Sequence, residues 1–88
     1  MPSYVLNDGT YNVQEFRSST DSASARLEMY GTQQVKIKLL FESHEVISDN
    51  VDMKITDWRY EAPFINMLIH GRSIQEETGT VTIKSKTR

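Results

Sequence analysis

The 88-residue sequence contains no cysteine, and this absence removes several kinds of chemistry at once. A chain without cysteine has no disulfide framework, no thiol nucleophile and no cysteine-based zinc site. No apolar run approaches the roughly 20 residues that a membrane-spanning helix needs. The first residues, MPSYVLNDG, also lack the basic and apolar regions of a signal peptide. We therefore expect a cytoplasmic protein that does not enter a membrane.

Glycine and histidine are scarce, and neither forms a recognisable functional motif. The four glycines are scattered, so no phosphate-binding loop is present, and no serine stands in a G-x-S-x-G pattern. His44 and His70 lie far apart without the spacing of a metal-binding pair. Glu76 and Glu77 fall in a predicted turn, where water disfavours acid–base catalysis. We predict no metal, no cofactor and no enzymatic activity.

The composition is that of one small folded domain covering residues 1–88. Hydrophobic residues make up 38% and charged residues 25%, which excludes a disordered chain. A chain of this length forms one modest core and has no room for a large enclosed substrate cavity. The net charge of -2 argues against an obligate nucleic-acid-binding protein.

Alternation of apolar and polar residues is the clearest positive signal in the chain. In one segment Val51, Met53 and Ile55 are two residues apart, which is typical of a half-buried strand. The segments that alternate in this way are 26–30, 34–41, 51–57, 64–75 and 80–85. Together with shorter apolar runs, they predict an all-β fold of seven or eight short strands. We expect an antiparallel meander, closed as a small barrel or folded as a compact sandwich.

Turn residues between these segments predict how the strands are connected. Hairpin turns are expected at 7–9, 30–33, 48–50 and 76–79. Gly71 is expected to form a bulge or bend inside the strand over 64–75. The acidic stretch 48–52 lacks the glycine and the distal glutamate of a calcium loop, so we interpret it as a turn.

The serine-rich part of the chain is ambiguous. We expect a loop over 18–24, followed by the strand over 26–30. The alternative is one short helix near residues 19–30, capped by Ser19 or Thr20 and closed by Gly31. Such a helix would have a poor apolar stripe, and the loop is therefore favoured.

The segment DWRYEAPF, residues 57–64, contains the most distinctive group of side chains. Continued alternation would bury Asp57, which is costly without a partner, so we expect the strand to end or bulge there. A bulge would turn Trp58 into the core. It would leave Arg59 and Tyr60 as the more exposed pair, within a loop that ends before the next strand.

We predict a small non-enzymatic binding protein that acts through protein–protein interaction, as an adaptor, an inhibitor or an immunity-like module. Tryptophan, tyrosine and arginine are enriched at protein interfaces, where buried aromatic anchors dominate affinity. The predicted partner-binding residues are Trp58, Arg59, Tyr60 and Phe64. Exposed strand edges, with Leu40 and Leu68 on polar faces, also favour a homodimer.

The alternative function is that of a small β-barrel binding single-stranded nucleic acid. Outward lysines on neighbouring strands would then follow the phosphates, with aromatic side chains stacking on bases. These lysines are Lys36, Lys38, Lys54, Lys84 and Lys86. Lysines in such positions also simply keep a sheet soluble, and we favour that explanation. A third possibility is a small-ligand-binding protein that uses a barrel mouth beside His44 or His70.

Overall fold

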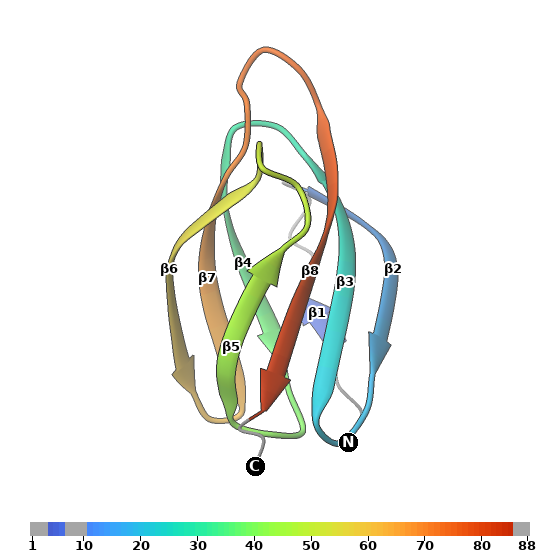
Figure 1. Ribbon diagram of the computed structural model, residues 1–88, viewed down its shortest axis with the longest axis vertical. Coiled ribbons are helices and arrows are strands. Elements are labelled where there is room, and N and C mark those ends of the chain that lie inside the picture. The colour runs from blue at the N-terminus through green and yellow to red at the C-terminus, as the bar shows by residue number, and fades with distance from the viewer. Residues whose placement is uncertain (1–3, 7–10, 86–88) are drawn as a thin grey trace.

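Two antiparallel sheets pack face to face in the computed structural model, which describes residues 4–6 and 11–85 (Figure 1). Within these residues the chain forms eight strands and no helix. The predicted all-β sandwich is therefore confirmed, and no closed barrel is formed. The alternative helix near 19–30 is wrong, and the favoured loop over 18–24 is reduced to residues 19–21, because one strand ends at Ser18 and the next begins at Ser22.

The chain passes repeatedly between the two sheets, and only β2–β3 and β6–β7 are consecutive strands of the same sheet. In order they are β1 (Tyr4–Leu6), β2 (Tyr11–Ser18), β3 (Ser22–Met29), β4 (Thr32–Lys38), β5 (Ser43–Ser48), β6 (Lys54–Glu61), β7 (Phe64–His70) and β8 (Glu77–Ser85). One sheet has the order β1-β4-β7-β6, and the other has the order β2-β3-β8-β5. We name them the β4–β7 sheet and the β3–β8 sheet after their central strands.

The core lies between the two sheets and is built mainly from the inward residues of the central strands, together with Met53, which precedes β6. Every second residue is buried in β3, in β7 and in β8 as far as Ile83, as strand alternation requires, and in β4 the buried residues are Val35 and Ile37. The largest fully buried side chains are Leu27, Met29, Val35, Ile37, Met53, Ile65, Met67, Ile69, Val81 and Ile83. Burying one such side chain stabilises the fold by about 1.5–3 kcal/mol, so this core holds the two sheets together.

At most positions where a hairpin was predicted, the chain instead passes from one sheet to the other. Two connections, β2–β3 and β6–β7, are hairpins within one sheet, whereas 30–31, 39–42, 49–53 and 71–76 cross between the sheets. The hairpins expected at 30–33 and 48–50 are therefore wrong. A turn residue signals that the chain reverses, and stacked sheets about 10 Å apart allow it to reverse into the other layer.

The remaining turn predictions also change in the structure. The turn expected at 76–79 is wrong, because β8 already begins at Glu77 and the connection is 71–76. The turn expected at 7–9 lies outside the described residues, although β1 and β2 belong to different sheets. Val51 was expected to point inward, but it is exposed in the connection before β6.

Gly71 follows the end of β7 instead of lying inside a longer strand, so the predicted bulge is wrong. Its N–H donates to the carbonyl of Gly31 over 2.7 Å. A Cβ at Gly71 would lie 3.0 Å from that carbonyl oxygen. The glycine is therefore explained by the close approach of two connections.

Three of the four edge strands contain a β-bulge. The extra residues are Gln14 in β2, His44 in β5 and Thr56 in β6, while the fourth edge strand, β1, has three residues. A bulge places successive inward side chains three residues apart instead of two. Bulged and short edges also hinder the addition of a further strand from another molecule.

Candidate binding surfaces

The segment 57–64 forms the second half of β6, a two-residue turn and the first residue of β7. The bulge at Thr56 returns Trp58 and Tyr60 to the inner side, where both are partly buried against the core. The expected bulge is confirmed. The expected loop and the exposed Tyr60 are wrong, because alternation resumes after the bulge. Glu61 pairs with Phe64 across the turn, in which the Ala62–Pro63 peptide is cis.

The predicted partner-binding residues are therefore divided between two faces. Trp58 and Tyr60 face the core, while Arg59 and Phe64 lie on the outer face of the β4–β7 sheet. The ammonium group of Lys36 lies 4.7 Å from the centre of the Phe64 ring. Such a cation–π contact at an exposed site contributes about 0.5–1 kcal/mol. Phe64 is thus partly covered by its own chain.

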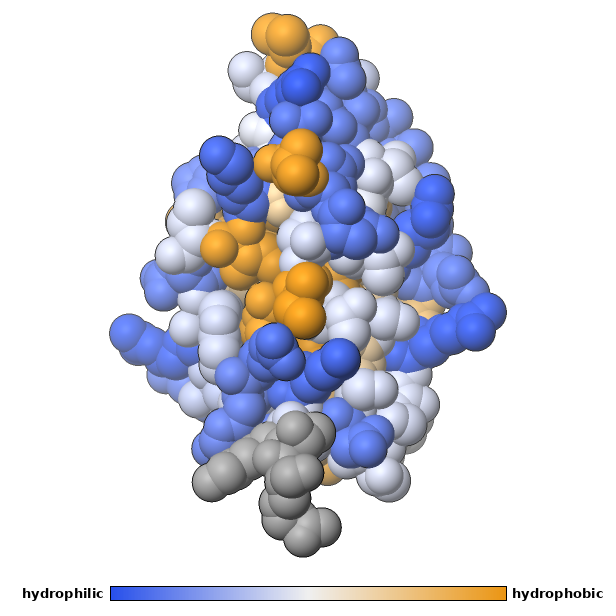
Figure 2. Space-filling model, in the orientation of Figure 1, coloured by the Kyte–Doolittle hydropathy of each residue, from blue (hydrophilic) through white to orange (hydrophobic). Residues whose placement is uncertain are grey.

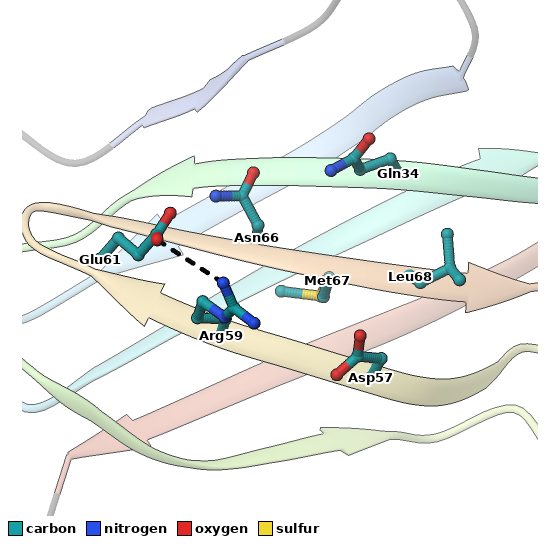
Figure 3. A pocket seen from close by; sticks show the side chains of 7 residues that line it. All are labelled: Gln34, Asp57, Arg59, Glu61, Asn66, Met67 and Leu68. Atoms are coloured by element: carbon teal, nitrogen blue, oxygen red, sulfur yellow. Dashed lines mark ion pairs between the residues drawn. The ribbon is translucent and has the colours of Figure 1, made fainter.

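A shallow hollow lies on this outer face beside Arg59 (Figure 3). Its volume is about 360 Å³, and its walls come from β4, β6 and β7. The lining residues are Gln34, Asp57, Arg59, Glu61, Asn66, Met67 and Leu68. The Arg59 side chain is 78% exposed and its guanidinium lies 3.9 Å from the Glu61 carboxylate. The hollow is open and polar, so it suits a weak contact with one polar group.

The lysines expected on one face are divided between the two sheets. Lys36 and Lys38 lie on the outer face of the β4–β7 sheet, whereas Lys84 belongs to β8 in the other sheet. Lys54 pairs with His70, at the far end of the sheet from Lys38. Lys86 lies outside the described residues. The single lysine face is therefore wrong, because β4 and β8 are not neighbours.

The two histidines also lie on different sheets. The Nδ1 atom of His70 lies 3.0 Å from the Thr32 hydroxyl, and the Nε2 atom of His44 lies 3.9 Å from the Glu42 carboxylate. In the described part of the chain, no group of three histidine or acidic residues could hold a metal ion. The hollow beside Arg59 contains neither histidine.

One end of the sandwich, which we call the loop end, is formed by the connections 30–31, 49–53 and 71–76 (top of Figure 1). Each connection carries one large apolar side chain that is exposed: Tyr30 by 53%, Val51 by 81% and Ile74 by 84%. Figure 2 shows apolar side chains over β5 and above it, toward the loop end. Toward the loop end these apolar side chains are separated by polar ones, so each is a candidate anchor for a partner and not part of one continuous apolar patch.

Backbone hydrogen bonds join two of these connections. The N–H of Gly31 donates to the Arg72 carbonyl over 2.8 Å, and the N–H of Gly71 donates back to the Gly31 carbonyl. Gly31 has a φ of 63°, a left-handed conformation that glycine adopts without steric cost. The connections 30–31 and 71–76 are therefore held against each other.

Arg72 links the third connection to this pair. Its Nη2 atom lies 2.9 Å from the Asp52 carboxylate, and its Nε atom lies 3.5 Å from the Glu77 carboxylate. Glu77 is only 7% exposed, and Gln75 also donates to it over 3.2 Å. A buried carboxylate needs such partners, because a charge without them costs several kcal/mol. Arg72 thus holds 49–53 and 71–76 together.

The connection 49–53 also rests directly on β8. The N–H of Thr80 donates to the Asp49 carboxylate over 2.7 Å, and the Asn50 amide donates to the Thr78 carbonyl over 3.0 Å. A Cβ at Gly79 would lie 2.9 Å from the Cβ of Asn50, so the strand has no room for a side chain there. The exposed apolar side chains are therefore presented on a held frame. Preorganisation of this kind lowers the entropy cost of binding.

Glu28 and Glu76 lie close together beside the loop end. Desolvation, the negative charge of Glu28 and a hydrogen bond between the two carboxyl groups raise the pKa of Glu76 above its ordinary value. Asn12 on β2 donates an amide hydrogen to Glu28 over 3.3 Å. The two acidic side chains thus interact at the surface.

The comparisons with known proteins leave the function to be argued from the structure. No protein-family model, no curated protein and no solved structure matches the chain. Among the residues that the structure describes, no helix is long and apolar enough to cross a membrane.

Tyr30, Val51 and Ile74 were not predicted as site residues. A prediction based on alternation treats apolar residues as buried. It also does not show that the three connections carrying these residues lie at the same end of the sandwich. The turn residues on both sides of Val51 were the available signal, because Ser48, Asp49, Asn50 and Asp52 end a strand there.

Proposed function

We propose that this domain binds another protein through the loop end and catalyses no reaction. The observation that carries the proposal is the exposure of Tyr30, Val51 and Ile74 on connections that are held together. Moving apolar surface out of water contributes roughly 25 cal/mol per Å², so three such side chains can anchor a partner. Their frame is in place before binding, which preserves more of that free energy.

The outer face around Arg59 and Phe64 is the second candidate surface. It fits a protein partner less well, because Trp58 and Tyr60 face the core and cannot serve as anchors there. Phe64 is partly covered by Lys36, and the hollow is mainly polar. This surface nevertheless offers an exposed arginine, the residue type that interfaces use most often besides aromatics.

The test compares serine substitutions at the two ends of the domain. In one variant a photo-crosslinking residue replaces Ser73, next to Ile74, and in a second variant it replaces Ala62 at the opposite end. Both variants are crosslinked in cells, and the crosslinked products are compared with and without nuclease treatment. We expect a protein to crosslink from position 73 in both cases. The affinity of that partner should fall at least tenfold in Val51→Ser/Ile74→Ser, since truncated anchors each cost about 1 kcal/mol or more.

The control is Leu40→Ser, which removes a half-exposed leucine at the other end. We expect this variant to bind within twofold of the wild type. If Arg59→Ala/Phe64→Ala removes the partner while Val51→Ser/Ile74→Ser retains it, the loop end is the wrong surface. Crosslinks that vanish with nuclease would support the nucleic-acid alternative instead.

A homodimer and a cytoplasmic location belong to the same proposal. The bulged edges disfavour a dimer formed by strand addition, so the outer face of the β4–β7 sheet, with its partly exposed Leu68, is the better route. Sedimentation equilibrium should then show a dimer for the wild type and a monomer for Leu68→Lys. A monomeric wild type would remove the dimer from the proposal, and fractionation of cells tests the location.

A further inference from the structure

The two ends of the sandwich differ in charge. We compare the connections at each end together with the three nearest residues of each strand. Among the residues that the structure describes, the loop end has five acidic residues, Glu28, Asp49, Asp52, Glu76 and Glu77, and two basic residues, Lys54 and Arg72. The opposite end has four acidic residues, Asp21, Glu42, Glu45 and Glu61, and five basic residues, Arg17, Lys36, Lys38, Arg59 and Lys84. The loop end is therefore negative, while the other end is close to neutral.

The negative charge at the loop end is not balanced locally. Arg72 is already shared between Asp52 and Glu77. Glu28 on β3 interacts with Glu76, which follows Ile74 by two residues in the connection 71–76, and like charges at short distance repel. An approaching cationic group would lower the energy of this arrangement, whereas an approaching anionic group would raise it.

Resting on the proposed function, we infer that the partner of the loop end is a protein whose apolar contact surface is bordered by lysine or arginine. The apolar side chains Tyr30, Val51 and Ile74 supply the contact area. The carboxylates around them favour a partner whose contact surface has positive charges at its border. Charge complementarity around an apolar centre speeds association and rejects partners of the wrong sign. The Debye length of about 8 Å at physiological salt lets these rim charges act on a docked partner.

The negative charge of the loop end also disfavours two other possible binding partners, an anionic membrane and a second copy of this chain. An anionic membrane surface attracts basic segments and repels a net negative one. A second copy of the loop end would bring its own carboxylates against Glu28 and Glu76, and like charges facing each other across an interface are unfavourable. A basic protein surface is the occupant that both the apolar and the charged groups fit.

The experiment uses defined probes and the whole chain. Two synthetic peptides of equal length, one alternating leucine with lysine and one alternating leucine with glutamate, are titrated into ¹⁵N-labelled protein, with oligolysine as a charge-only probe. We expect the leucine–lysine peptide to shift the amide signals of Gly31, Val51 and Ile74. The leucine–glutamate peptide and oligolysine should each bind at least tenfold more weakly at these positions.

Two charge variants separate the rim from the apolar centre. Glu28→Gln/Glu76→Gln should weaken the leucine–lysine peptide roughly three- to tenfold, as expected for two exposed charge contacts. Glu42→Gln/Glu45→Gln changes the net charge equally at the opposite end and should stay within twofold of the wild type. Glu28→Lys/Glu76→Lys should reverse the preference between the two peptides.

The outcomes distinguish this inference from the proposed function. Equal binding of both leucine-containing peptides at the loop end would overturn the charge preference and leave the proposed function standing. If neither peptide shifts the loop-end signals, the charge preference and the proposed function are both wrong. Loop-end shifts caused by phosphatidylserine vesicles, or by dilution from a loop-to-loop dimer, would replace the basic partner with a membrane or a second copy.

Discussion

The loop end and the opposite end of the sandwich close the same eight strands by different means. At the opposite end, two of the three described connections are hairpins, β2–β3 and β6–β7, whose strands pair directly. At the loop end all three described connections cross between the sheets. A crossing connection cannot continue a strand ladder, so its backbone groups need other partners. Arg72, Asp49, Asn50 and the glycines supply those partners.

This difference also explains where apolar side chains are exposed. A hairpin keeps strand alternation up to its turn, and the inward positions of β6 remain against the core as far as Tyr60. In a connection that crosses between the sheets, the alternation of inward and outward side chains stops where the strand ends. Val51 and Ile74 therefore do not point into the core and are exposed. The loop end therefore exposes apolar residues on a frame that depends on long-range contacts.

Among substitutions at the two ends of the sandwich, the largest expected effect on stability comes from filling the space between β8 and the connection 49–53. Gly79→Ala would place a methyl group 2.9 Å from the Cβ of Asn50, and something must shift. We expect the free energy of unfolding to fall by about 2–3 kcal/mol, as for other overpacked sites. Urea denaturation measures it. Gly31→Ala is the comparison, because a Cβ at Gly31 would meet no other atom but the residue has a φ of 63°. We expect this variant to lower the free energy of unfolding by about 1–2 kcal/mol.

Removal of Arg72 tests whether long-range ion pairs hold the loop end. Arg72→Ala leaves the buried Glu77 carboxylate with only amide donors, and we expect a loss of about 1–2 kcal/mol, because Arg72 itself is half exposed. Arg59→Ala removes an exposed pair at the opposite end and should change stability by less than about 0.5 kcal/mol. Equal losses in the two variants would show that the ends do not differ in this respect.

A smaller effect is expected from the acidic pair beside the loop end. The pKa of Glu76 in the folded protein lies above its ordinary value of 4.5, so ionisation as the pH rises disfavours the folded state. Glu76→Gln should therefore raise the Tm at pH 7, and the difference from wild type should disappear as the pH falls below 4.5. A gap that persists at acidic pH would mean that charge is not its cause. Glu42→Gln serves as the control.

The smallest effect on stability is expected where the proposed effect on binding is largest. Val51→Ser and Ile74→Ser alter side chains that are already in water, so each should change the free energy of unfolding by less than about 0.5 kcal/mol. Ile37→Ala in the core should cost about 2–5 kcal/mol in the same assay. A large loss of stability in either serine variant would show that the side chain supports the fold and is not reserved for a partner.

Strand positions were predictable from the sequence, but bulges and sheet partners were not fully so. Val35, Ile37, Met67 and Ile69 follow strict alternation and are buried as expected. Ile55 and Trp58, three residues apart, both face inward because Thr56 is an extra residue. Alternation alone cannot show whether such spacing ends a strand or marks a bulge, although the cost of burying Asp57 pointed to the bulge.

The candidate site was less predictable than the fold. Arg59 was correctly expected to be exposed, but Tyr60 was not, since its orientation depends on the residue count through the bulge. The lysines were assigned to one face on the assumption that their strands are neighbours. Pairing of strands depends on which packing buries the most apolar surface, and this involves residues far apart in the chain.

The sequence by itself determined that this protein is a small all-β domain with one core, because side-chain alternation and turn residues are local properties of the chain. It also shows that this chain contains no cysteine. Only the tertiary structure decided which strands share a sheet, which side chains the bulges turn inward, and that Tyr30, Val51 and Ile74 lie at one end. These properties depend on contacts between distant residues such as Arg72 and Asp52, which local patterns do not encode.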